Sequence, residues 1–275
     1  GALAEYFGAI EGASLEANKG AYSYAWMIIF AVIAAIMVLI GLYHIRMLPS
    51  NQIPSTTKKT TSEVGRELVA VIANFFTKKH IFYYICFIIL YRLAEGFIMK
   101  IAPLFLRASR EVGGLGLSLK EIGTLNGVFG SAAFVLGSLL AGIYVSKFGL
   151  KRTLFTLCCI FNLPFLAYTF LAVTQPTNVY LIGTCITMEY FGYGFGFVGL
   201  TLFMMQQIAP GKHQMSHYAF ASGIMNLGVM LPGMVSGYFS DLLGYRNFFI
   251  YVLIATIPAF LITYFIPFTY DDSKK

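Results

Sequence analysis

The sequence predicts an all-α membrane protein with seven transmembrane helices, six of which form two inverted three-helix repeats. The first reason is composition, because 58% of the residues are hydrophobic and only 11% are charged, which is outside the range of soluble domains. The second is an internal echo, in which GIYVSKFGLKR at 142–152 returns 95 residues later as GYFSDLLGYRN at 237–247. Each copy lies between two apolar runs, and a period of three spans is typical of transporters built from repeated units.

A transmembrane helix needs roughly 20 consecutive apolar residues. Runs of this length occur at 21–45, 81–106, 121–145, 153–173, 179–208, 215–238 and 246–267.

The first run is predicted to be a spanning helix over 21–46. It is not a cleaved signal peptide, because acidic residues precede it and it ends in His44 and Arg46 instead of a small-residue cleavage site. Residues 1–20 are expected to be an external segment or the end of a preceding helix. Because the chain starts at Gly1 without Met, we expect it to be part of a longer protein.

The longest hydrophilic segment runs from His44 to His80, and residues 47–80 are predicted to be a cytoplasmic central loop. Within it, apolar residues recur at near-helical spacing beside polar positions: Val64, Leu68, Val71, Ile72, Phe75 and Phe76. This pattern predicts an amphipathic helix on the cytoplasmic membrane surface. It would tether two halves of a larger protein.

The remaining spans form two units, 81–173 and 174–267, followed by a cytoplasmic tail at 268–275. With the 44–80 loop in the cytoplasm, twelve of the nineteen Lys and Arg residues are cytoplasmic and five are external, while the other two, Arg92 and Lys100, lie within a span. The loop at 146–152 is then cytoplasmic and the loop at 239–245 external, so the two units are inverted. Alternatively, Gly and a basic residue recur by chance in tight turns, where Gly supplies positive φ.

Two carboxylates, Glu95 and Glu189, fall inside apolar spans, where ionisable groups are costly unless they face a cavity or a partner. Arg92 is three residues before Glu95 and can pair with it. Glu189 has no basic residue within a helical turn, so it is the better candidate proton carrier, and Arg92 is a candidate anchor for a substrate carboxylate or phosphate. Both features have structural alternatives, namely a purely structural ion pair and a hydrogen bond from Glu189 to a neighbouring helix.

Further polar residues in the spans are weaker candidates. Lys100 either lines a vestibule or snorkels to the interface, with the second preferred. Asn126 either contacts a solute or bonds another helix, and Tyr193 lies near Glu189 and could line a sugar or peptide path. Gly194, Gly196 and Gly199 spell GxGxxG, but no strand precedes them, so close helix packing is expected and not dinucleotide binding.

The chain resembles the major facilitator superfamily, and within it the muropeptide permease and acetyl-CoA transporter branch. In the superfamily's loop signature Gly142, Gly149, Lys151 and Arg152 match, whereas Ser146 replaces the Asp; the second copy has Gly237, Asp241, Gly244 and Arg246. The likeness to the branch is carried by YRLAEGF (91–97), LFLR (104–107), LSLKEIGTLNGVFG (117–130) and EYFGYGFG (189–196). It extends over about residues 21–267, which correspond to the sixth helix, the central loop and the C-terminal six-helix half.

The resemblance implies proton-driven transport of a bulky polar solute across a bacterial inner membrane, with no cofactor, and a muropeptide is the solute expected at the level of the family. The expected partners are membrane lipids, the solute and an N-terminal six-helix half. No basic stripe interleaved with aromatics points to nucleic acid. The alternatives are a superfamily transporter of a peptide, drug or sugar, a membrane-embedded scaffold, and an intramembrane enzyme that uses His213 and His217. These two histidines are four apart like metal ligands but have no HExxH glutamate, so no metal site and no enzyme are expected.

Overall fold

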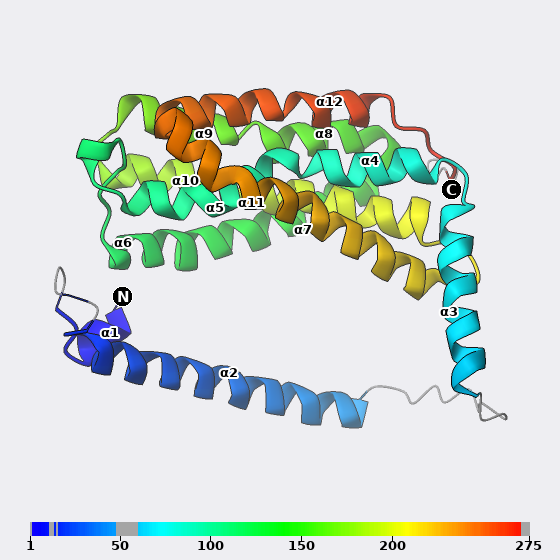
Figure 1. Cartoon of the computed structure of the whole chain (residues 1–275), viewed down its shortest axis with the longest axis horizontal. Coiled ribbons are helices and arrows are strands. Elements are labelled where there is room, and N and C mark those ends of the chain that lie inside the picture. Colours follow the sequence, from blue (N-terminus) through cyan, green and yellow to red (C-terminus); the bar gives the residue numbers. More distant parts are fainter. Residues whose placement is uncertain (1, 11–13, 15, 48–59, 271–275) are drawn as a thin grey trace. The chain divides into compact units, whose positions relative to one another are not determined.

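The computed structural model describes residues 2–10, 14, 16–47 and 60–270, and within them it is built from helices (Figure 1). The chain divides into two compact units, residues 1–63 and 64–275. Parts of the predicted central loop (48–59) and tail (271–275) lie outside the described residues, as do Lys58, Lys59, Lys274 and Lys275. The prediction of an all-α membrane protein is confirmed for the described part of the chain.

The first unit contains a short helix, α1 (Ala2–Tyr6), and the long helix α2 (Lys19–Met47). The 29 residues of α2 extend over about 44 Å at 1.5 Å per residue, which is longer than the hydrocarbon core of a bilayer. The Asn18 side chain fixes the turn before α2, because it accepts a bond from the Ile10 N–H at 2.9 Å and donates to the Ile10 carbonyl at 2.8 Å. The helix predicted over 21–46 is present as α2, which begins two residues earlier and ends one residue later than predicted.

The second unit begins within α3 (Thr61–Phe76), the amphipathic helix predicted in the central loop. The next predicted span, 81–106, consists of α4 (Ile81–Tyr91) and α5 (Leu93–Arg107), which are separated by a break at Arg92. After a 3-10 turn, η1 (Arg110–Val112), the next span contains α6 (Leu119–Thr124), the π-helical turn η2 (Leu125–Gly130) and α7 (Ser131–Phe148).

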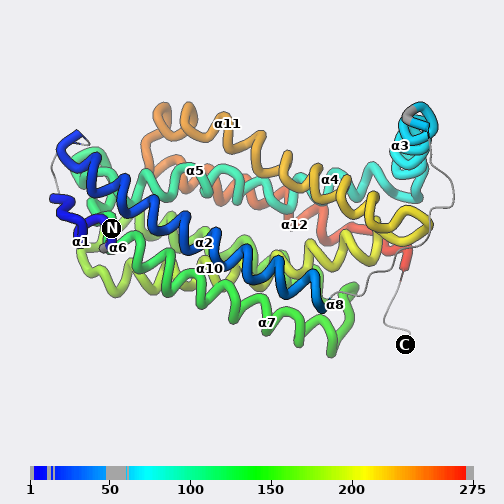
Figure 2. Tube along the Cα trace, turned by 90° about the horizontal axis from the view of Figure 1, so that it is seen from below, coloured from blue at the N-terminus to red at the C-terminus, as the bar shows by residue number. Residues whose placement is uncertain are grey.

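The remaining helices complete the bundle. α8 (Leu150–Asn162) and α9 (Phe165–Thr174) form one span around Pro164. α10 (Val179–Phe203) continues into a second π-helical turn, η3 (Met204–Ile208). α11 (Gln214–Ala255) and α12 (Ile257–Tyr264) form the last stretch, which runs to one end of the bundle and turns back (Figure 2).

Five helical stretches among the described residues are long and apolar enough to cross a membrane: Lys19–Met47, Ile81–Arg107, Leu119–Phe148, Leu150–Thr174 and Gln214–Tyr264. The last is 51 residues long; it holds the predicted span 215–238 and all but the last three residues of the predicted span 246–267. The predicted span 179–208 corresponds to α10 and η3, which are not among the five stretches. α10 has 25 residues, enough to cross a bilayer, but it carries Glu189 and several glycines and tyrosines.

Each copy of the sequence echo contains a glycine with the same unusual backbone. Gly149 has φ 79° and ψ 148°, and Gly244, 95 residues later, has φ 70° and ψ 160°. Only glycine adopts this region without strain. Each glycine separates two helical segments, so the echo marks two equivalent helix breaks.

The glycines of α10 let it approach its neighbours closely. A Cβ atom at Gly194 would lie 2.1 Å from the Phe134 carbonyl oxygen, and one at Gly192 would lie 2.4 Å from that of Ile160. The GxGxxG pattern therefore serves helix packing, as predicted: α10 lies directly against α7 on one side and α8 on another.

Candidate functional site

The helical break at Arg92 places a charged side chain inside the bundle. Arg92 has φ −105° and ψ 6°, so α4 ends before it and α5 begins after it. The span predicted over 81–106 is present as the membrane-length stretch Ile81–Arg107, and the structure adds a break at Arg92 within it. Eleven helical residues precede the break, which puts Arg92 roughly 17 Å from the start of α4.

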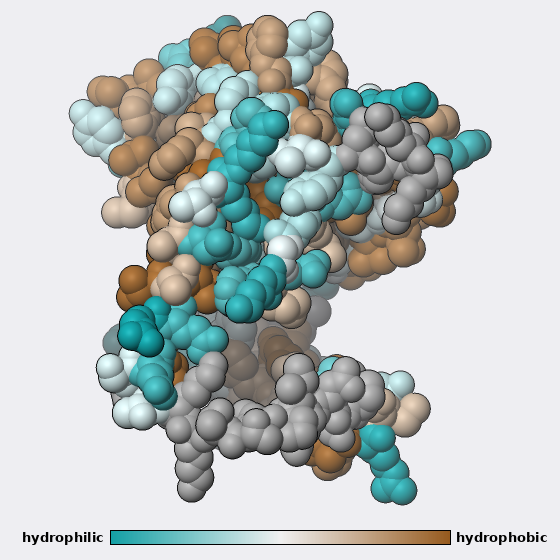
Figure 3. Space-filling model, turned by 90° about the vertical axis from the view of Figure 1, so that its right-hand side faces the viewer, coloured by the Kyte–Doolittle hydropathy of each residue, from teal (hydrophilic) through white to brown (hydrophobic). Residues whose placement is uncertain are grey.

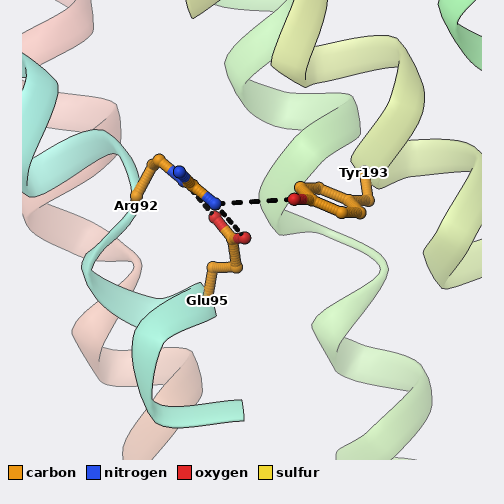
Figure 4. Close-up of polar contacts among 3 residues, drawn as sticks. All are labelled: Arg92, Glu95 and Tyr193. Carbon is orange, nitrogen blue, oxygen red and sulfur yellow. Dashed lines mark hydrogen bonds and ion pairs between the residues drawn. The ribbon is translucent and has the colours of Figure 1, made fainter. Parts of the chain in front are cut away.

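Arg92 and Glu95 form a buried bidentate ion pair, and their exposed fractions are only 5% and 6%. Arg92 Nε donates to Glu95 Oε2 at 2.6 Å, and Nη2 donates to Oε1 at 2.5 Å (Figure 4). The pairing predicted from their spacing is confirmed. Such charge-assisted fork geometry is among the strongest hydrogen-bonded arrangements in proteins.

Two aromatic residues of α10 complete the surroundings of the guanidinium. Arg92 Nη2 lies 3.5 Å from the Tyr193 hydroxyl oxygen (Figure 4), and the guanidinium carbon lies 5.3 Å from the centre of the Phe197 ring. The second distance is within the range of a cation–π interaction. Glu95 thus occupies the place in which a solute anion was expected, and Arg92 is held from several sides.

A cavity of about 120 Å³ adjoins this pair. The polar and tyrosine residues of its lining come from α5, η2, α9 and α10: Glu95, Asn126, Tyr168, Glu189, Tyr190 and Tyr193. Its other apolar residues all come from α5: Ile98, Met99, Ala102, Pro103 and Leu106. Its volume is enough for a few water molecules but is smaller than the roughly 300–1,000 Å³ typical of ligand pockets. The tertiary structure therefore brings both intramembrane carboxylates to one small internal space.

Two acceptors in this cavity lack donors. The Asn126 Oδ1 atom is buried without a hydrogen-bond partner, and Glu189 has neither a hydrogen bond nor an ion pair within the described part of the chain. Asn126 belongs to the π-helical turn η2, a local geometry that is frequent at functional sites. A buried acceptor without a partner costs about 1–3 kcal/mol, so this space favours a proton or a hydrogen-bond donor.

The other predicted residues lie elsewhere. Lys100 is exposed, packs beside Gly233 of α11 and does not line the cavity. His217 is buried, with its Nε2 atom 3.3 Å from the Val71 carbonyl oxygen, and its ring centre lies 5.9 Å from that of His213. No group of three His, Cys, Asp or Glu side chains within the described ranges is placed to hold a metal ion.

The residues of the two loop motifs lie apart from this cavity. Gly142, Ser146, Gly149 and Arg152 border a separate, open cavity of about 540 Å³ at the turn between α7 and α8. Ser146 donates to the Ile143 carbonyl at 2.9 Å, so its hydroxyl caps its own helix. Lys151 is exposed. In the second copy Gly237, Asp241, Gly244 and Arg246 are all exposed.

Two members of the site were missed or undervalued from sequence. Tyr168 lines the cavity from α9, and Phe197 faces Arg92. Tyr168 is one of eighteen tyrosines and carries no local signal. Phe197 is four residues after Tyr193 on one helix, so the face containing Glu189 and Tyr193 could have included it.

This fold and site define a polytopic helical membrane protein with ionisable groups buried inside its bundle. The chain belongs to the Major Facilitator Superfamily, a family of transporters, because the family's sequence profile matches residues 1–208.

Several curated relatives are similar to this chain. The anhydromuropeptide permease of Escherichia coli strain K12 is 23% identical over 209 residues, which cover 76% of this chain and 41% of that protein. Putative transporter AmpG 1 of Rickettsia bellii is 25% identical over 238 residues, 85% of this chain and 56% of that protein. The chain thus spans about half the length of the curated relatives it matches. The resemblance to the muropeptide permease branch is confirmed.

Proposed function

We propose that this chain is the C-terminal half of a secondary active transporter that moves a bulky polar solute by proton-coupled alternating access. One observation carries the proposal: Glu189, which has no partner among the described residues, borders the same internal cavity as the Arg92–Glu95 pair. Ionisable residues inside membrane helices commonly mark solute and proton pathways. The proposed transporter includes two inverted units, 81–173 and 174–267, and an N-terminal half outside this chain.

In this proposal the two carboxylates have different roles. The Glu95 charge is balanced by Arg92, so the pair stays in the interior without a mobile proton. An ionised Glu189 would be a half-buried charge inside a membrane span without a compensating partner, which is costly. Glu189 therefore takes up a proton while the cavity is closed and releases it when the cavity opens to water.

The solute is expected to bind in a more open state than this one, because about 120 Å³ is too small for a sugar-peptide. The solute would then meet the amide of Asn126 and the hydroxyl groups of Tyr190 and Tyr193. The two tyrosine rings suit contact with sugar or peptide groups. The name of one relative, anhydromuropeptide permease, makes a muropeptide the first solute to test. We place the protein in the inner membrane of a bacterium, with the 44–80 loop in the cytoplasm.

Uptake by the full-length gene product in proteoliposomes, with and without a proton gradient, tests this function. Glu189→Gln keeps the shape of the side chain but cannot exchange a proton, so gradient-driven uptake should fall at least about tenfold while solute exchange without a gradient persists. Glu111→Gln is the matched control, since Glu111 is an exposed carboxylate in η1. Undiminished gradient-driven uptake by Glu189→Gln would remove the proton-carrier role.

The solute is tested by a binding screen on the same proteoliposomes. Anhydromuropeptides, short peptides and free sugars are compared, and the proposal expects saturable binding of the first class. Binding of peptides or sugars alone would assign the chain to another solute within the superfamily.

A further inference from the structure

The helix α3 is held against the end of the second unit by buried contacts. Val71 and Phe75 are buried, and the Phe75 ring centre lies 5.7 Å from both His217 and Phe220 of α11. His217 Nε2 faces the Val71 carbonyl at 3.3 Å. Immediately after α3, Lys78 Nζ donates to the carbonyl of Ile208 and, at 2.7 Å, to that of Pro210. The orientation of α3 toward the bundle is therefore fixed at its C-terminal end.

Part of the apolar face of α3 has no cover. Val64, Leu68, Val69 and Phe76 are 52%, 57%, 65% and 47% exposed. At about 100° per residue these four fall within about 140° of the helix circumference. Polar and small residues occupy the other side, including Arg66, Glu67, Ala70 and Asn74. We call the four exposed residues the apolar stripe.

The apolar stripe is continuous with the apolar outer surface of a membrane-length helix. The Phe76 ring centre lies 6.4 Å from that of Phe82, which is 70% exposed in the first turn of α4. α4 and α5 together form one of the stretches that are long and apolar enough to cross a membrane. Acyl chains that surround α4 would therefore meet the stripe directly.

The direction of α3 fits the same surroundings. α3 runs across the end of the bundle, roughly perpendicular to its helices, and its N-terminal turns extend past the side of the second unit (Figure 1). Figure 2 shows α3 nearly along its axis at the same end. Hydrophilic residues gather near the centre of the view that faces this end, and apolar residues flank them (Figure 3). A helix perpendicular to the membrane-spanning helices lies parallel to the bilayer plane.

We propose that the part of α3 from Val64 to Phe76 is an interfacial helix whose apolar stripe inserts among the acyl chains of a phospholipid bilayer. Arg66 and Lys79, both exposed, would lie at the level of the phosphate groups and attract them. Phe75 and Lys78 face the bundle and hold the helix to α11 and to the chain that follows α10. This inference depends on the membrane-spanning class of the protein and is independent of the proposed solute and proton carrier.

Tryptophan fluorescence in proteoliposomes tests the lipid contact. The chain contains a single tryptophan, so Trp26→Phe provides a silent background for the full chain. Leu68→Trp places the probe in the apolar stripe. Ala70→Trp, two residues on, places it about 200° around the helix and serves as the matched control. Val64→Trp and Ala73→Trp, about 180° apart, repeat the comparison if the first pair fails to fold.

The proposal expects phospholipids with brominated acyl chains to quench the probe of Leu68→Trp at least about twofold, and aqueous iodide to quench the probe of Ala70→Trp at least about threefold more than that of Leu68→Trp. Equal iodide quenching in both variants would put the stripe in water and overturn the proposal. Shielding of the Leu68→Trp probe from iodide without quenching by brominated lipid would mean that protein covers the stripe, which overturns the lipid assignment.

Discussion

Removing the charge of Glu95 is the sharpest test of the buried ion pair. In Glu95→Gln, Arg92 keeps its position in the break but loses the carboxylate to which it makes two short bonds. Arg92 is 5% exposed and does not line the adjoining cavity, so bulk water does not reach the guanidinium to replace the lost carboxylate. Breaking one side of a buried pair costs about 3–5 kcal/mol.

The surroundings set where in that range the cost should fall. The glutamine oxygen can still accept one bond, and Phe197 lies 5.3 Å from the guanidinium carbon, a cation–π contact worth about 1 kcal/mol. The long Tyr193 contact, at 3.5 Å, adds little. We therefore expect Glu95→Gln to lower the free energy of unfolding by about 3 kcal/mol, the lower end of the range.

The assay is unfolding in mixed detergent micelles, followed by circular dichroism, for the full chain and a double-mutant cycle. Arg92→Met alone should also cost about 3 kcal/mol, because it leaves the Glu95 charge unpaired. Arg92→Met with Glu95→Gln removes both charges, so its cost should be well below the sum of the two single costs, with a coupling of at least about 2 kcal/mol. Additive costs, or single costs below about 1 kcal/mol, would refute the view that the pair is buried and coupled.

The remaining predictions concern packing, backbone and pH. Gly194→Ala would bring a Cβ atom 2.1 Å from the Phe134 carbonyl oxygen, so it should lower the melting temperature strongly. Gly223→Ala, which has open space around it, should instead raise the free energy of unfolding by about 0.5–1 kcal/mol. Equal effects of the two variants in thermal denaturation would count against the close approach of α10 and α7. Gly149→Ala and Gly244→Ala should each destabilise by about 1–3 kcal/mol because both positions need positive φ, and tolerance of either in the same assay would contradict the proposed equivalence of the two breaks. Burial lowers the pKa of Lys78 from its ordinary value of 10.5; the unfolded chain then binds more protons, so the free energy of unfolding should rise as the pH increases from the folded pKa toward 10.5. Lys78→Arg, which does not titrate there, should lack this rise in alkaline denaturation curves, and an identical rise in both proteins would exclude Lys78 as its source.

Much of this molecule is encoded locally. Runs of roughly 20 apolar residues fixed where membrane-length helices form, because an uncovered backbone in hydrocarbon has to satisfy its hydrogen bonds within one helix. The breaks at Gly149 and Gly244 were also readable, since few residues other than glycine adopt their backbone angles. The spacing of Arg92 and Glu95 likewise predicted a contact that depends on one stretch of chain.

Other features required the packing of distant segments. Nothing near Arg92 predicted that the helix would stop there, because the break accompanies contacts with Tyr193 and Phe197, which lie on a helix far along the chain. The shared cavity of Glu95, Asn126 and Glu189 joins three separate spans, and helical periodicity states only which residues share a face of their own helix.

The amphipathic helix shows the same division within one element. Its apolar and polar faces were evident from residues 64–76, because a repeat of about 3.6 residues is a property of the sequence. Which part of the apolar face packs on the protein and which part stays free was decided by the position of His217 and Phe220. The sequence by itself thus determined the membrane class, the helices and the position of their glycine breaks. Only the tertiary structure decided which polar groups meet, because their contacts join helices that are far apart along the chain.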